Sequence, residues 1–135
     1  MKWLYRHLHK KEKGFTLVEL MVVIIILAVL TGIAIPSYLA LRNRARIQAT
    51  RSEMQNIATA LEMYAADNDA YPAGAWGVAS GLIIAGGYMD PVPLDDAWTT
   101  ALVYTIVGSG YTLVSWGPDL AAGGDDIILT DGQLN

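Results

Sequence analysis

The chain has 135 residues, enough for one small domain with an appendage, and it contains no cysteine, which excludes disulfides, thiol catalysis and cysteine-based metal or haem sites. Its net charge of −4 conceals a segregation of charge, because all nine lysines and arginines lie at or before Arg51, whereas eleven of the thirteen acidic residues follow it. A domain without basic residues binds a phosphate backbone poorly, so we expect no nucleic acid among the partners.

The first predicted element is an apolar segment behind a basic leader. Every residue from Leu20 to Leu30 is apolar, and with its flanks the stretch reaches about 20 residues, the length of a membrane-spanning helix. Residues 1–13 carry five positive charges and one negative charge. The positive-inside bias then keeps the N-terminus in the cytoplasm and places the C-terminal domain on the other side. The alternative is a secretory signal peptide cleaved near residues 32–34.

Glu19 lies at the start of this apolar segment. A carboxylate at the edge of the hydrocarbon region is costly without a partner, so such residues are functional candidates by default. No lysine or arginine lies nearby on the same helix face, and we therefore expect the partner of Glu19 to come from another molecule. The alternative is a carboxylate that reaches the membrane interface and has no partner.

The segment around Glu19 contains a recognisable motif. Its sequence, Lys13-Gly14-Phe15-Thr16-Leu17-Val18-Glu19-Leu20 followed by an apolar run and Pro36, resembles the processing signal of type IV pilins and type II secretion pseudopilins. The resemblance implies that a prepilin peptidase cuts after Gly14 and methylates the new N-terminus, Phe15. It also implies that Glu19 meets the N-terminal amine of a neighbouring subunit. Residues 1–14 would be a cleaved cytoplasmic leader, and residues 15–36 the transmembrane and assembly helix.

A second helical segment follows at residues 37–70. Proline and glycine weaken a helix, so Gly32 and Pro36 predict a kink where the chain leaves the membrane. The family resemblance implies instead a segment that stretches during packing, and both can hold. Apolar residues then recur at three- and four-residue spacing, which predicts an amphipathic helix packed on a small sheet. Its first part holds the four arginines of the mature chain, Arg42, Arg44, Arg46 and Arg51, which suit anionic lipid headgroups or acidic groups of neighbouring copies.

Residues 71–135 predict a small β-sheet domain. Polar residues before Pro72 end the long helix, and a short helix is expected at 78–85. Residues 102–107 and 111–116 are rich in β-branched and aromatic side chains around a Gly-bounded turn at 108–110, which predicts a hairpin. Residues 127–130 predict a third strand. The fold class is therefore α+β, one long helix carrying a small antiparallel sheet.

The loop after the hairpin is rich in glycine and acid. Asp119, Asp125 and Asp126 lie on flexible backbone with no basic residue to pair them. Calcium prefers several carboxylate and carbonyl oxygens on a loop that can wrap around it, although the spacing is not that of an EF-hand. A solvated acidic loop is the alternative interpretation.

The C-terminal motifs extend the resemblance to one branch of the family. Tyr71-Pro72, the acidic-Ala-Trp segment at 95–98, the Y-x-L-x-S-x-G-x-D pattern at 111–119 and the loop ending in Asp126-Ile127 look like the major, G-type pseudopilin of type II secretion. This implies a type IV pilin-like fold and calcium held by Asp119 and Asp126, with Asp125 as a further ligand. The segment at 95–99 departs from the family pattern, because it lacks the proline and glycine expected around the tryptophan.

The resemblance implies a structural function. The chain would polymerise into a periplasmic filament that aids protein export, anchored in the inner membrane and partnered by minor pseudopilins, the assembly platform, prepilin peptidase and membrane lipid. No arrangement of nucleophile and base is visible and both histidines lie in the leader, so we expect no enzyme. The alternatives are a subunit of a surface type IV pilus for adhesion, motility or DNA uptake, and a secreted soluble binding module.

Overall fold

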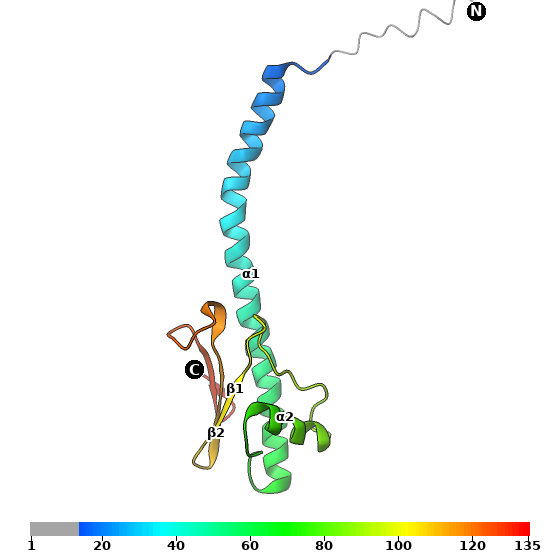
Figure 1. Cartoon of the computed structure of the whole chain (residues 1–135), viewed down its shortest axis with the longest axis vertical. Coiled ribbons are helices and arrows are strands. Elements are labelled where there is room, and N and C mark those ends of the chain that lie inside the picture. Colours follow the sequence, from blue (N-terminus) through cyan, green and yellow to red (C-terminus); the bar gives the residue numbers. More distant parts are fainter. Residues whose placement is uncertain (1–13) are drawn as a thin grey trace, which may run out of the picture. The chain divides into compact units, whose positions relative to one another are not determined.

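The computed structural model describes residues 14–135, so the predicted leader at 1–13 lies outside the described residues. The chain divides into two compact units, one ending at Leu39 and one from Ala40 to Asn135. Helix α1 (Leu17–Asn68) continues through Pro36 (Figure 1). Its first part is exposed along its whole length, and α1 contains a stretch long and apolar enough to cross a membrane.

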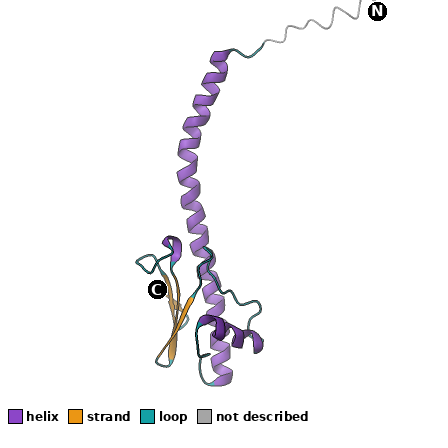
Figure 2. Cartoon of the chain, in the orientation of Figure 1, coloured by secondary structure: helices purple, strands orange, loops and turns teal. Residues whose placement is uncertain are grey.

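The second unit is an α+β domain, as predicted (Figure 2). It holds the end of α1, helix α2 (Trp76–Ala85), and strands β1 (Val103–Val107), β2 (Gly110–Ser115), β3 (Ile127–Thr130) and β4 (Gln133–Leu134). The four strands form one antiparallel sheet in the order β1-β2-β3-β4. Helix α2 begins two residues before the predicted start, and the first hairpin turns on two residues, with Val107 opposite Gly110.

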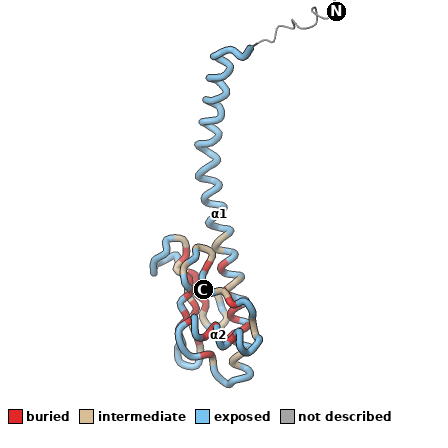
Figure 3. Tube along the Cα trace, turned by 45° about the vertical axis from the view of Figure 1, so that its right-hand side comes forward, coloured by how far each residue is buried: buried red, intermediate tan, exposed pale blue. Residues whose placement is uncertain are grey.

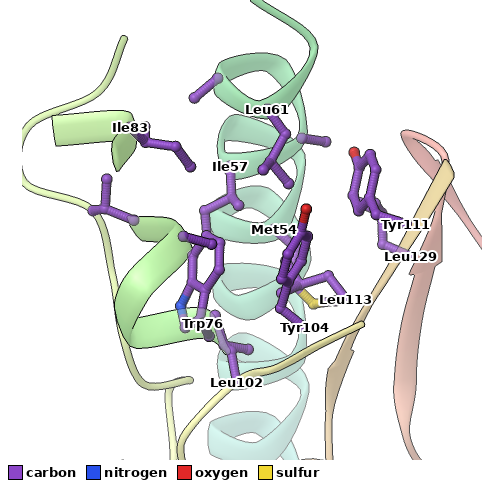
Figure 4. Packing of buried hydrophobic residues seen from close by; sticks show 14 of the residues in the cluster. Met54, Ile57, Leu61, Trp76, Ile83, Leu102, Tyr104, Tyr111, Leu113 and Leu129 are labelled. Carbon is purple, nitrogen blue, oxygen red and sulfur yellow. The ribbon is translucent and has the colours of Figure 1, made fainter. Parts of the chain in front are cut away.

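The core of this unit lies between α1 and one face of the sheet. Met54, Ile57 and Leu61 recur at three- and four-residue spacing on α1, and all three are fully buried. They pack against alternate residues of β2 and β3, such as Leu113 and Leu129, and against α2 (Figure 4). Buried residues in Figure 3 are confined to this unit. The apolar face predicted for this part of α1 is therefore the face that packs against the sheet and α2.

The short strand β4 is not predicted by the sequence pattern. Two left-handed residues, Asp131 at φ 47° and Gly132 at φ 79°, make the turn that returns the chain beside β3. An Asp-Gly pair is the preferred sequence for such a two-residue hairpin turn. The strand has only two residues, which is too short for a hydrophobic alternation to be visible.

Candidate functional site

The N-terminal end of α1 is capped by the predicted assembly residue. Thr16 donates its backbone N–H to Glu19 Oε2 at 2.9 Å and its hydroxyl to the same oxygen at 2.8 Å, while the Glu19 N–H donates to Thr16 Oγ1 at 3.2 Å. This reciprocal pair is a capping box, which satisfies N–H groups that the first helical turn leaves free. Glu19 therefore already has a hydrogen-bond partner within its own chain, Thr16. The partner expected from another molecule would have to replace it. Thr16 could not be predicted as this partner from charge, because its hydroxyl and backbone N–H are neutral donors.

The predicted cleavage site is accessible in this unit. Gly14 precedes the helix, with no atom within 4 Å of a Cβ placed on it, and Phe15 is 82% exposed. Phe15 continues the exposed apolar surface of the first part of α1, and a contiguous apolar surface of this kind marks a contact with a membrane or another protein.

Pro36 lies inside α1. Because proline has no N–H, the Gly32 carbonyl lacks the donor that a helix normally provides four residues later. The Ser37 hydroxyl donates to the neighbouring Ile33 carbonyl at 3.2 Å, and Thr31 donates to Leu27 at 2.7 Å. One helical hydrogen bond is thus missing at Pro36, and the helix nevertheless continues without a break to Asn68.

The four arginines lie at the start of the second unit. Arg42, Arg44 and Arg51 are exposed, and Arg46 is partly buried. Among the residues that the structure describes, none of them forms an ion pair with an acidic side chain. No carboxylate among the described residues therefore neutralises their charge.

The acidic loop joins the 3-10 helix η2 (Gly117–Asp119) to β3. Asp119 Oδ2 and Asp125 Oδ1 lie 3.6 and 3.7 Å from a Cβ placed on Gly123, and Asp126 Oδ1 accepts the Gly123 N–H at 3.1 Å. The three predicted ligands therefore border one glycine. They do not converge on one another, since within residues 14–135 no three acidic or histidine side chains are close enough to hold a metal ion.

A buried carboxylate anchors the beginning of this loop. Asp96 is 5% exposed and accepts hydrogen bonds from the N–H groups of Trp98 and Thr100 and from the Ser115 hydroxyl, the last at 2.6 Å. The fully buried Ser115 oxygen in turn accepts the Gly117 N–H at 3.2 Å. Sequence reasoning noted the acidic pair at 95–96 but missed this network, because burial of one aspartate of two is not visible in a sequence.

A second acidic feature lies where α1 meets the β3–β4 turn. Glu62 Oε1 occupies the place that a Cβ on Gly132 would take, and the adjacent Asp131 accepts the Tyr111 N–H at 2.8 Å. Tyr111 is fully buried, and its hydroxyl lies beside the Gly132 backbone without forming a hydrogen bond of good geometry among the described residues. Burial chiefly, and then the Glu62 carboxylate, raises the pKa of Tyr111.

Comparison with known proteins agrees with this division of the chain. The family model described as "Prokaryotic N-terminal methylation motif" matches residues 9–35, and the one described as "Type II secretion system (T2SS), protein G" matches residues 37–130. No solved structure matches the chain.

The chain also resembles several curated proteins, each named type II secretion system core protein G. The protein of Pseudomonas aeruginosa is 30% identical over 87% of this chain and 91% of its own length. That of Escherichia coli K12 is 34% identical over 90% and 92%, and that of Vibrio cholerae is 30% identical over 93% and 94%. This family consists of structural subunits and not of enzymes, which confirms the expectation from sequence. The apolar helix, the methylation motif and the small sheet domain together place this chain in the protein G family of type II secretion pseudopilins.

Proposed function

We propose that this chain is the major structural subunit of a type II secretion pseudopilus, stored in the inner membrane and polymerised through α1 into a periplasmic filament that aids protein export. The observation that carries the proposal is the first part of α1, a fully exposed apolar helix that no residue of the chain covers within the described range. Such a surface requires lipid in the stored subunit and other helices in the filament.

Processing prepares the N-terminus for this assembly. A prepilin peptidase would cut after Gly14, which leaves a methylated amine on Phe15 at the edge of the membrane. Glu19 would then leave its capping contact with Thr16 and accept the amine of a neighbouring copy, so that each charge is neutralised. The missing hydrogen bond at Pro36 would allow the helix to stretch as subunits pack. The basic residues before the span favour a cytoplasmic N-terminus and a periplasmic domain.

The surface type IV pilus, the alternative reading from the sequence, is less well supported, because the family match and the curated relatives all belong to type II secretion. Minor pseudopilins and an inner-membrane assembly platform would be the remaining protein partners.

Filament formation by a Glu19 variant tests the proposal. Cells producing Glu19→Ala should keep the protein in the membrane and yield few filaments in the sheared extracellular or periplasmic fraction. The matched control is Glu53→Ala, which removes a carboxylate of the same length from the second unit. Equal filament yields from Glu19→Ala and the unaltered chain would contradict the proposed assembly mechanism.

We further propose that the acidic loop binds calcium. The loop offers only oxygen donors, which suits a hard cation, and three carboxylates border Gly123 without a basic residue to neutralise them. Asp119, Asp125 and Asp126 would hold the ion, with backbone carbonyls and water completing its coordination. Because the three carboxylates do not converge in the described structure, binding would have to draw them together, and the bound ion would then fix the conformation of the loop.

Calcium titration of the unaltered protein tests this site. An ion that binds only the folded chain raises stability by about 2.7 kcal/mol at a hundredfold excess over its Kd. Asp119→Ala and Asp126→Ala should abolish this increase, whereas Asp90→Ala, at an exposed position outside the loop, should retain it. Thermal unfolding that is unchanged by calcium or by a chelator would refute the calcium proposal and leave the filament proposal standing.

A further inference from the structure

The four arginines of α1 have a charge that the fold does not use. Arg42, Arg44 and Arg51 are exposed, Arg46 is partly buried, and no carboxylate within residues 14–135 pairs with any of them. No other lysine or arginine follows the leader. A guanidinium stays charged at physiological pH and binds phosphate groups through several N–H donors in a planar fork. These side chains are therefore available to an anionic partner.

The exposed apolar surface of α1 extends beyond Pro36 as far as the first arginine. Tyr38, Leu39 and Leu41 are 65%, 51% and 63% exposed, and Arg42 follows directly in the same helix. Tyrosine is enriched where a membrane helix meets the headgroups. The surface that needs lipid therefore continues five residues past the end of the span predicted from the sequence.

The aliphatic hydroxyl groups in this stretch are compatible with hydrocarbon. Thr31 and Ser37 each donate to the backbone carbonyl four residues earlier, at 2.7 and 3.2 Å. A hydroxyl bonded in this way presents no free donor to the lipid, and proline is tolerated inside membrane helices. Ser37 and Pro36 therefore do not mark the end of the span.

The length of α1 between its flanking charges fits the thickness of a bilayer. Residues 20–41, which lie between Glu19 and Arg42, extend about 33 Å along the helix. At the average tilt of about 20° this length projects to about 31 Å, against a hydrocarbon core of about 30 Å. A span that began after Glu19 and ended at Pro36 would extend only about 25 Å.

Height along α1 separates three of the arginines from the fourth. The headgroup layer is about 5–7 Å thick on each side of the hydrocarbon. Arg46 lies about 7 Å beyond Leu41, whereas Arg51 lies about 15 Å beyond it. Arg44 lies about 200° around the helix from Arg42, so the two exposed side chains in this layer occupy opposite sides of α1. One protein surface reaches one side of a helix, while headgroups surround it.

We propose that Arg42, Arg44 and Arg46 bind the phosphate groups of anionic phospholipids in the leaflet at the C-terminal end of the span, and that the span covers residues 20–41. The partner is lipid because the arginines continue directly from the exposed apolar surface and have the complementary charge. The eleven acidic residues after Arg51 are repelled by the same leaflet, so the attraction acts on this segment alone. The inference rests on the proposed function, because it concerns the subunit stored in the membrane.

Lipid binding by the purified full chain in a neutral detergent tests the partner. Phosphatidylglycerol, phosphatidylcholine and inorganic phosphate are titrated separately, and bound molecules are counted by native mass spectrometry. Each basic residue near an anionic surface adds about a fivefold preference, so phosphatidylglycerol should bind about a hundredfold more tightly than phosphatidylcholine. The triple variant R42Q/R44Q/R46Q should lose most of this preference. Equal binding of the two lipids, or binding of inorganic phosphate as tight as that of phosphatidylglycerol, would overturn the inference.

A matched pair of single variants tests the role of height. Arg44 and Arg51 lie within about 20° of each other around α1, and both are exposed, so they differ chiefly in distance from the hydrocarbon. R44Q should lower the lipid preference about fivefold, whereas R51Q should change it by less than about twofold. If the triple variant fails to fold, R42Q/R44Q leaves the partly buried Arg46 in place and should still lose about 25-fold. Equal losses in R44Q and R51Q, or fewer filaments from the triple variant with an unaltered lipid preference, would overturn the inference.

Cysteine accessibility in vesicles that contain phosphatidylglycerol locates the end of the span. The chain has no cysteine, so each introduced cysteine is unique. Leu41→Cys and Ile26→Cys should both react with a water-soluble maleimide much more slowly than Ser52→Cys, which lies at an exposed position of the second unit. Reaction of Leu41→Cys as fast as that of Ser52→Cys would overturn the proposed span and leave the filament function intact. Equally fast reaction of Ile26→Cys would instead contradict the proposed function, because the apolar helix would not be in the membrane.

Discussion

Removing the Ser115 hydroxyl should destabilise the second unit strongly. In Ser115→Ala, Asp96 Oδ2 loses a donor at 2.6 Å, and the Gly117 N–H loses its acceptor at 3.2 Å. A hydrogen bond to a charged group contributes about 1.5–3 kcal/mol, and a buried group left without a partner costs about 1–3 kcal/mol. Because both effects occur at one fully buried position, we expect a loss of about 3 kcal/mol, a large part of the stability of a small domain.

Urea unfolding of the purified chain in detergent, followed by tryptophan fluorescence, measures this loss. The urea midpoint should fall by about 1 M or more, since small domains lose about 1–3 kcal/mol per molar urea. The matched control is Ser109→Ala, which removes an exposed hydroxyl from the first hairpin turn and should change stability by less than about 0.5 kcal/mol. Equal midpoints for Ser115→Ala and Ser109→Ala would refute the role assigned to the Asp96 network.

Three further predictions follow from the core, the acidic loop and the tyrosines. Leu61→Ala should cost about 2–5 kcal/mol by opening a cavity, whereas Met63→Ala, at a side chain that is 52% exposed, should cost little in urea unfolding. Gly117→Ala should lower the thermal midpoint, because φ is +69° and the new Cβ would lie 2.7 Å from a backbone carbonyl; Gly124→Ala, with open space around it, is the control and should not. Burial raises the pKa of Tyr104 from 10.0 to about 12, so its contribution to stability is complete below pH 10 and is lost as the pH rises through about 12. Stability measured at fixed urea should therefore stay level up to pH 10 and then fall, and a fall well below pH 10 together with phenolate absorbance would contradict this.

The long helix and the core strands could be predicted from the sequence because their signals are local. Apolar spacing on α1 marked Met54, Ile57 and Leu61 as the face that carries the sheet, and all three are buried there. The third strand was predicted at Ile127–Thr130 and lies there in the structure. The resemblance to pseudopilins, based on the processing motif and the C-terminal patterns, is confirmed by the family comparisons.

The features that the sequence could not predict depend on contacts between distant residues. Nothing in the acidic pair at 95–96 indicates that Asp96 is buried against Ser115, nineteen positions later. Tyr111 was predicted as a strand residue, but the surroundings of its buried hydroxyl depend on where Glu62 and the β3–β4 turn meet. Helix periodicity indicates which side of α1 is buried, and it says nothing of which loop covers that side.

The intact mass and N-terminal sequence of the protein in sheared filaments test the account most directly. The account predicts a chain that begins at Phe15, carries one methyl group on its amine and extends to Asn135. That result would establish processing after Gly14 and polymerisation of the mature subunit together. A chain that begins near Ile35 would indicate a secreted soluble domain, and one that still begins at Met1 would indicate a simple membrane anchor. Either would contradict the proposal that this protein works as a filament subunit.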